Sequence, residues 1–141
     1  ATVQLAAQGD VYVFQVSACG GPPPGLRRLL EDANIGKAGI GISNDGLKLR
    51  RDFGVQCGGL LDLSQLAARV LPDGARTWCL AELSERVLRR RLPKDPELRI
   101  GSNWAAPQLS AEQIEYAALD AWAGRLLAVA LLRSAAAAPT A

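Results

Sequence analysis

Short apolar runs alternate with longer stretches of helical periodicity along most of this 141-residue chain. Two β-prone runs, residues 2–7 and 11–16, flank Gln8-Gly9-Asp10 and predict an antiparallel hairpin. The glycine-punctuated runs 37–42 and 58–63 are typical of buried strands in α/β sheets. Spacing of apolar positions then predicts helices at residues 25–33, 48–53, 63–70, 80–91 and 110–134.

The last of these helices carries the most informative residue in the chain. Ser110 provides an N-cap, and at 3.6 residues per turn Asp120 shares a face with Tyr116, Gly124 and Leu127. A carboxylate on such a face costs several kcal/mol unless a cation, a metal or strong donors accompany it. We therefore expect Asp120 to have such a partner. The simpler alternative is that Asp120 lies at the edge of the core and reaches water.

A hairpin followed by alternating strands and helices predicts a layered α/β fold. We expect one domain over residues 1–134 and an alanine-rich tail at 135–141, with a turn at Pro72-Asp73-Gly74 and a polar loop at 94–104. The longest apolar run, residues 126–132, is far too short to span a bilayer, so we expect no membrane partner.

The amino-acid composition excludes several types of catalytic and metal site. The chain has no histidine, which excludes Ser-His-Asp and Cys-His catalysis as well as histidine-ligated zinc. Its three cysteines, Cys19, Cys57 and Cys79, are widely spaced, and we expect reduced core thiols of an intracellular protein. Any metal must then be held by oxygen ligands, which favours Mg²⁺ or Mn²⁺.

Asp45 is a second candidate acid, because it follows a buried-type strand and opens a helix. Capping of that helix by Ser43, Asn44 or Asp45 explains the same pattern equally well. Tyr116 has a hydroxyl that stays neutral near pH 7, so it suits orienting a water better than abstracting a proton. An ordinary half-buried tyrosine is the plain alternative for Tyr116. The net charge of +2 is too small to indicate nucleic-acid binding by itself.

Three sequence blocks carry a family resemblance over nearly the whole chain. They are KAGIGISNDGLKLRRDFG from Lys37, LLDLSQLA from Leu60, and LRIGSNWAAPQLSAEQIEYAALDAWAG from Leu98. Together they resemble the DEDDy 3′–5′ exonuclease domain, the family of ribonuclease D and of the Werner syndrome exonuclease domain. Asp45 alone would carry no such resemblance, whereas the Tyr116-x-x-x-Asp120 block is fairly specific.

The resemblance implies a ribonuclease H-like, DnaQ-like fold, with a mixed sheet flanked by helices. It also implies hydrolysis of nucleic acid from the 3′ end with two divalent ions, Mg²⁺ or Mn²⁺. By the same resemblance, Asp45 and Asp120 match two of the four metal-binding acids, and Tyr116 matches the tyrosine that positions the attacking water. Lys48 and Arg99 are candidate nucleic-acid contacts, whose binding would depend on salt.

The chain departs from the family pattern in one respect. An Asp-x-Glu on an apolar strand should precede the hairpin, but the only Asp-x-Glu is Asp95-Pro96-Glu97, in a polar loop where proline suits a buried strand badly. Two divalent ions call for about four carboxylates, and Asp45 and Asp120 supply two. The absent methionine agrees with this, so we expect an N-terminally truncated fragment of a larger parent chain, inactive by itself.

Three functions remain open on the sequence. The first is a 3′–5′ exonuclease acting on DNA or RNA 3′ ends inside the cell, in the nucleus or an organelle. The second is a degenerate, non-catalytic nuclease-like module that binds nucleic acid or a protein partner. The third is a structural α/β domain in which Tyr116 and Asp120 are incidental.

Overall fold

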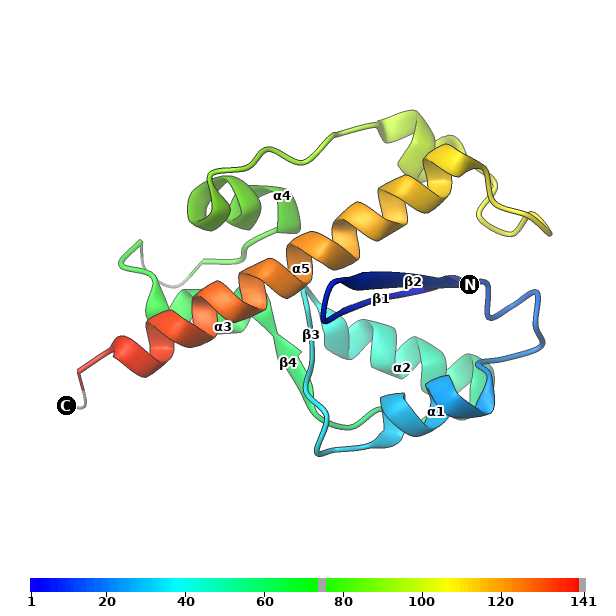
Figure 1. The fold of residues 1–141 in the computed structure, drawn as a ribbon, viewed down its shortest axis with the longest axis horizontal. Helices are drawn as coiled ribbons and strands as arrows, with labels where there is room; N and C mark the ends of the chain where they lie inside the picture. Colours follow the sequence, from blue (N-terminus) through cyan, green and yellow to red (C-terminus); the bar gives the residue numbers. More distant parts are fainter. Residues whose placement is uncertain (74–75, 140–141) are drawn as a thin grey trace.

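In the computed structural model, helix α5 runs the length of the molecule, and β1, β2, β3, α3, α4 and η1 pack against it (Figure 1). The structure describes residues 1–73 and 76–139. The strands are β1 (Val3–Ala7), β2 (Asp10–Phe14), β3 (Lys37–Gly39) and β4 (Leu60–Asp62). The helices are α1 (Pro24–Glu31), α2 (Ile42–Phe53), α3 (Leu63–Val70), α4 (Leu80–Leu83), the π-helices η1 (Ser84–Leu88) and η2 (Glu97–Gly101), and α5 (Ala111–Ala137).

The strands form two separate pairs. β1 and β2 are the predicted antiparallel hairpin, with Ala7 opposite Asp10 and a turn in which Gln8 and Gly9 both have positive φ. β3 and β4 are parallel, and their close approach needs Gly59, where an added Cβ would lie 2.6 Å from the Ile35 carbonyl oxygen. Among the described residues no strand joins the two pairs, although α5 packs against β1, β2 and β3.

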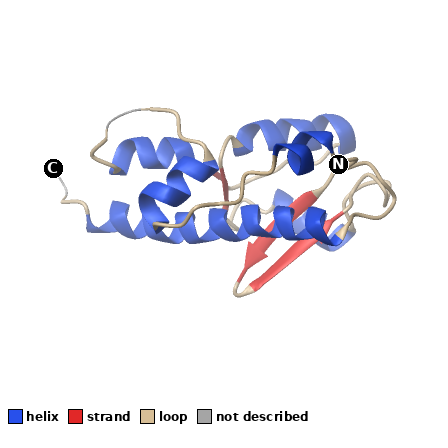
Figure 2. Ribbon diagram, turned by 90° about the horizontal axis from the view of Figure 1, so that it is seen from above, coloured by secondary structure: helices blue, strands red, loops and turns tan. Residues whose placement is uncertain are grey.

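Two hydrophobic clusters support these two pairs. Beside the hairpin, Val16 after β2 packs with Leu26 and Leu30 of α1 and with Val55 after α2. The second cluster lies between α3, α4 and the C-terminal half of α5, which run together at the far end of the molecule (Figure 2). Its buried members are Leu63, Ala67, Trp78, Leu83, Leu127 and Leu131. The apolar side chains are therefore buried in two groups, one beside the hairpin and the other against the C-terminal half of α5.

Local capping explains the elements that were predicted most closely. α3 covers the predicted residues 63–70, and the Asp62 carboxylate accepts a hydrogen bond from the Ser64 backbone N–H at 2.9 Å. α5 begins after Ser110, whose hydroxyl accepts from Gln113 N while the Gln113 side chain accepts from Ser110 N. The helix continues to Ala137, three residues beyond the predicted end at Ser134, because alanine is the strongest helix former.

The predicted start of α2 is wrong. The helix begins at Ile42, and its N-cap is Gly41 in the left-handed conformation (φ 62°), with no side-chain capping hydrogen bond. Asp45 therefore lies in the first turn of the helix and does not cap it. The capping explanation for Ser43, Asn44 and Asp45 is excluded, and the Asp45 carboxylate is left free for another partner.

The region between α3 and α5 also differs from the prediction. The helix expected over residues 80–91 is the short α4 followed by η1, and it ends where Arg89 adopts a left-handed φ of 55°, before Pro93. The loop expected at 94–104 contains η2. Pro72 and Asp73 form the predicted turn, whereas Gly74 lies outside the described residues.

The prediction of three core thiols is wrong for two of them. All three cysteines are free, but Cys19 and Cys79 are exposed and only Cys57 is partly buried. Both exposed thiols lie outside helices and strands. Cys19 is in the loop after β2, and Cys79 is just before α4. No helix within residues 1–73 and 76–139 combines the length and apolarity needed to cross a membrane.

A buried lysine joins α1 to β3, and we expect its loss to be costly. Lys37 is only 7% exposed, and its Nζ donates to the Leu29 carbonyl at 3.1 Å and to the Asp32 carbonyl at 2.5 Å. Both acceptors belong to the C-terminal turn of α1, where a cation is favourable. Lys37→Met should lower the free energy of unfolding by about 2 kcal/mol, measured by urea denaturation.

Lys94→Met is the matched control for this prediction. Lys94 is exposed and donates no hydrogen bond within the described part of the chain, so its replacement should change stability by less than about 0.5 kcal/mol. Equal effects at the two positions would contradict the assigned role of Lys37.

Candidate active site

The candidate site centres on the N-terminal half of α5. Ala117, Gly124 and Leu127 are buried, while Tyr116 and Asp120 on the same side of the helix are partly buried. Tyr116 and Asp120 thus lie one turn apart at the border of the core, as their spacing predicts. No hydrogen bond or ion pair within residues 1–73 and 76–139 satisfies the Asp120 carboxylate, so a half-buried anion is left without direct donors.

The segment before α5 is held against this helix by contacts of Asn103 and Trp104. The Trp104 ring packs at a tilt against Tyr116, with centroids 6.2 Å apart, and its Nε1–H donates to the Leu98 carbonyl at 3.2 Å. Gln113 Nε2–H donates to the Asn103 carbonyl at 3.3 Å. These contacts place Arg99, the residue after Leu98, next to Tyr116 and Asp120.

Burial and Arg99 act in opposite directions on the two groups. Desolvation raises the pKa of Asp120, and the positive charge of Arg99 partly offsets this. Desolvation also raises the pKa of Tyr116, with a smaller contribution from the negative charge of Asp120 and an opposing one from Arg99. The Tyr116 hydroxyl is therefore neutral through the physiological range. It can donate a hydrogen bond to, or accept one from, a water beside Asp120.

Asp45 and Lys48 form a second, separate group in α2. Both are exposed, and they lie one turn apart on the helix. Desolvation raises the pKa of Asp45, and the Lys48 ammonium partly offsets this rise. Asp45 also lies near the positive N-terminal end of α2, which favours an anion there. The arrangement leaves the Asp45 oxygens open to a ligand.

The described residues do not assemble a complete metal site from their own side chains. Across residues 1–73 and 76–139, no group of three or more Asp, Glu, Cys or His side chains could hold a metal ion. The charged groups that shift the pKa of Asp120 do not include Asp45, and those acting on Asp45 do not include Asp120. It therefore stays a prediction that Asp45 and Asp120 bind the same two metal ions, as do the roles of Tyr116, Lys48 and Arg99.

One neighbour of the site was missed on the sequence. Asp95 lies near enough to Tyr116 to raise the pKa of that hydroxyl, and its carboxylate accepts from the Leu98 backbone N–H at 2.9 Å. An aspartate three residues before a helical N–H is a capping signal that could have revealed this role. Asp95 is exposed and lies in a loop, in agreement with the rejection of Asp95-Pro96-Glu97 as a strand motif.

Comparison with known proteins identifies this arrangement. A family model described as 3′–5′ exonuclease matches residues 1–135, which include both helices of the candidate site. The chain belongs to the 3′–5′ exonuclease family. This exonuclease domain is 40% identical over 128 residues to the mouse bifunctional 3′–5′ exonuclease/ATP-dependent helicase WRN, and 38% identical over 123 residues to a 3′–5′ exonuclease of Arabidopsis thaliana.

The domain covers only part of these relatives. The matches include 90% and 87% of this chain, but 9% of the mouse protein and 42% of the Arabidopsis protein. Among solved structures, Brucella melitensis NrnC bound to pGG is 27% identical, with a TM-score of 0.78, over 94% of this chain and 63% of that one. The likeness confirms the predicted mixed α/β, ribonuclease H-like fold.

Proposed function

We propose that this exonuclease domain contributes half of a two-metal active site, which hydrolyses phosphodiester bonds from the 3′ end of nucleic acid. Asp45 and Asp120 each supply one metal-binding carboxylate, and Tyr116 holds the attacking water. The observation that carries the proposal is the half-buried Asp120, which accepts no hydrogen bond from the described residues and lies one turn from Tyr116, in a chain of this family. An ionised carboxylate in that setting destabilises the fold unless a cation binds to it.

The chemistry of the donor set fits magnesium or manganese. The candidate ligands are carboxylate oxygens, and hard divalent ions prefer such oxygens. A pair of these ions, when bound, activates water and stabilises the attacking and leaving oxygens of an in-line displacement. Tyr116, neutral because its pKa is raised, orients the water through its hydroxyl. Lys48 and Arg99, both exposed beside the two acids, bind backbone phosphates of the substrate.

We propose that the remaining two carboxylates come from an Asp-x-Glu strand lying between β1 and β3. Three features support this position. The two strand pairs are unconnected among the described residues, α5 packs against both, and each has its own apolar cluster. A strand there would form one sheet from the two pairs and place its acids near α5. The 141 residues alone therefore bind the two metal ions poorly and are inactive.

A labelled oligonucleotide tests this proposal directly. The substrate carries a 5′ label, and the products are followed in Mg²⁺ or Mn²⁺ on a denaturing gel. Two proteins are compared: the 141-residue chain, and an extended chain that adds the residues encoded in frame immediately upstream. The extended chain should shorten the substrate stepwise from its 3′ end, and the 141-residue chain should leave it intact. Cleavage by the short chain, or an inert extended chain that carries the Asp-x-Glu, would overturn the proposal.

One observation favours a second candidate, the non-catalytic binding module. The part of the chain that the structure describes has no three-residue metal-binding group, as expected of a degenerate nuclease. An upstream sequence without Asp-x-Glu, together with salt-sensitive oligonucleotide binding by the 141-residue chain, would support this candidate. Under either function we place the protein in a reducing intracellular compartment, which its three free cysteines support.

A further inference from the structure

The positive charge of the chain is concentrated in one short part of it. Residues 86–99 contain six of the 16 lysines and arginines but only two of the 14 acids, Asp95 and Glu97, so this part carries a charge of +4. The rest of the chain therefore carries a charge of −2. We call residues 86–99 the basic segment. Such an excess of positive charge is self-repelling, and bound anions would relieve the repulsion.

The basic segment leaves η1 at a strained residue and then runs toward the candidate active site. Arg89 has a left-handed φ of 55°, which arginine rarely adopts, and it turns the chain out of η1. Residues 89–95 form no helix or strand, and Leu92 and Asp95 each precede a proline, which favours extended backbone. In Figure 1 this loop runs back along α5, from α4 to the N-terminal end of α5. Its cations are therefore arranged in a row along the helix.

Three cations of this row are free to bind a ligand. Arg89, Arg90 and Lys94 are exposed, and none of them forms an ion pair in the part of the chain that the structure describes. Two further arginines of the basic segment, Arg86 and Arg91, each pair with a nearby carboxylate. A row of unpaired cations on exposed, extended backbone can contact successive phosphates of one strand.

The row of cations ends at the candidate active site. Arg99 partly offsets the rise that burial causes in the pKa of Asp120 and in the pKa of Tyr116. The Arg99 guanidinium is therefore within electrostatic reach of both groups. A strand whose 3′ end lies at Asp120 would pass Arg99 and then continue along the three free cations.

An unpaired strand fits this path better than a duplex does. The scissile phosphodiester has to approach Asp120, which is half-buried, and Ile100 beside Arg99 is 75% exposed. The bases of a single strand are free to pack on an uncovered apolar side chain, and its one phosphate backbone can follow an extended segment. In a duplex the bases are paired and stacked on one another.

We propose that the basic segment binds the phosphates of single-stranded nucleic acid, on the 5′ side of the nucleotide that occupies the candidate active site. The position of the 3′ end rests on the proposed function, whereas binding of a single strand by Arg89, Arg90 and Lys94 does not. These three cations and Arg99 contact about four phosphates. The logarithm of the affinity should then fall with the logarithm of the salt concentration with a slope of about −3.

Fluorescence anisotropy tests this proposal without cleavage. A labelled single strand of about 12 nucleotides is titrated with the 141-residue chain in EDTA. The triple variant Arg89→Gly/Arg90→Gln/Lys94→Gln removes the free cations, and glycine suits the left-handed backbone at position 89. Binding at about 50 mM salt should weaken roughly 30-fold, and the salt slope should fall to about −1. Circular dichroism should show the helix content of the unmodified chain.

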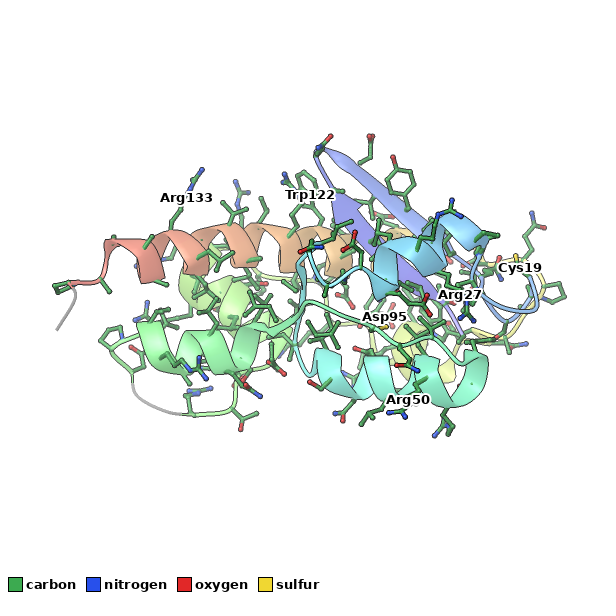
Figure 3. All side chains as sticks on the ribbon, turned by 90° about the horizontal axis from the view of Figure 1, so that it is seen from below. Cys19, Arg27, Arg50, Asp95, Trp122 and Arg133 are labelled. Carbon is green, nitrogen blue, oxygen red and sulfur yellow. The ribbon has the colours of Figure 1, made fainter. Side chains whose placement is uncertain are left out.

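A second triple variant is the matched control. It replaces three exposed arginines outside the basic segment, Arg28→Gln/Arg69→Gln/Arg133→Gln. Figure 3 shows Arg133 on the C-terminal part of α5, well away from Asp95 of the basic segment. Both triple variants lower the net charge from +2 to −1, so a difference between them reports where the charge lies. The control should bind within about threefold of the unmodified chain, because distant exposed charges are screened.

Three results would overturn the proposal. They are equal weakening by the two triple variants, an affinity of the unmodified chain that does not depend on salt, and a blunt duplex bound as tightly as the single strand. The two-metal site is tested separately by cleavage in the extended chain. An extended chain that leaves its substrate intact, while the 141-residue chain shows the expected binding, contradicts the two-metal site and leaves the basic segment as a strand-binding surface.

Discussion

Asp120→Asn should reduce 3′-end trimming by roughly 10³-fold in the extended chain proposed above, in which an upstream Asp-x-Glu would complete the four acids. The substitution keeps the shape of the side chain, but it replaces a charged ligand with a neutral amide that binds a hard divalent ion weakly. Loss of several kcal/mol of electrostatic stabilisation in the transition state corresponds to that factor. The measurement is kcat/KM on the labelled oligonucleotide at saturating Mg²⁺, together with calorimetric titration of Mn²⁺.

Glu112→Gln is the matched control for Asp120→Asn. Glu112 is an exposed carboxylate in the first turn of the same helix, so its loss should change trimming by less than about threefold. A variant at Asp120 that retains full activity, or one whose Mn²⁺ affinity is unchanged, would remove this residue from the metal site.

The same substitution should stabilise the metal-free protein at neutral pH, and the sign follows from linkage. Burial raises the pKa of Asp120 in the folded chain above the ordinary value of 3.8, so between these two pKa values the folded state binds more protons than the unfolded state. The stabilising effect of the protonated acid is fully present below pH 3.8 and is lost as the pH rises through the folded pKa. Asp120→Asn removes the buried charge, so its urea midpoint at pH 7 should exceed that of the unmodified chain.

The sequence predicted best those parts of the molecule whose causes are local. The Ser110 N-cap and the helical spacing of Tyr116 and Asp120 both act within four residues, and each is present as expected. The predicted start of α2 failed because Gly41 adopts a left-handed conformation that no side-chain pattern marks. Backbone geometry at one glycine thus decided whether Asp45 caps a helix or lies free in its first turn.

Features that depend on distant parts of the chain were harder to predict from the sequence. The helix expected over residues 80–91 ends early, because the π-helix η1 stops at Leu88 and Arg89 adopts a left-handed conformation. Exposure of Cys19 and Cys79 likewise depends on which loops cover them. Arg99 beside Asp120 was placed by family resemblance, since no periodicity relates a loop residue to a helix that begins twelve residues later.

Tyr116→Phe should lower kcat of the extended chain by roughly 10²-fold and leave KM nearly unchanged. Phenylalanine retains the ring that packs against Trp104, so the fold and substrate binding persist, and only the hydroxyl that orients the water is lost. Because burial and Asp120 raise the pKa of Tyr116, the hydroxyl stays neutral well above pH 9. The pH–rate profile between about 6 and 9 should therefore have the same form with and without the hydroxyl.

Tyr12→Phe provides the matched comparison, since Tyr12 is the other tyrosine of the chain and is 50% exposed on β2. Its replacement should leave kcat and KM within about twofold. Two results would contradict a water-positioning Tyr116. One is a loss confined to KM, which would indicate a substrate contact. The other is a basic limb that disappears with the hydroxyl, because it would mean that the tyrosinate accepts a proton during the reaction.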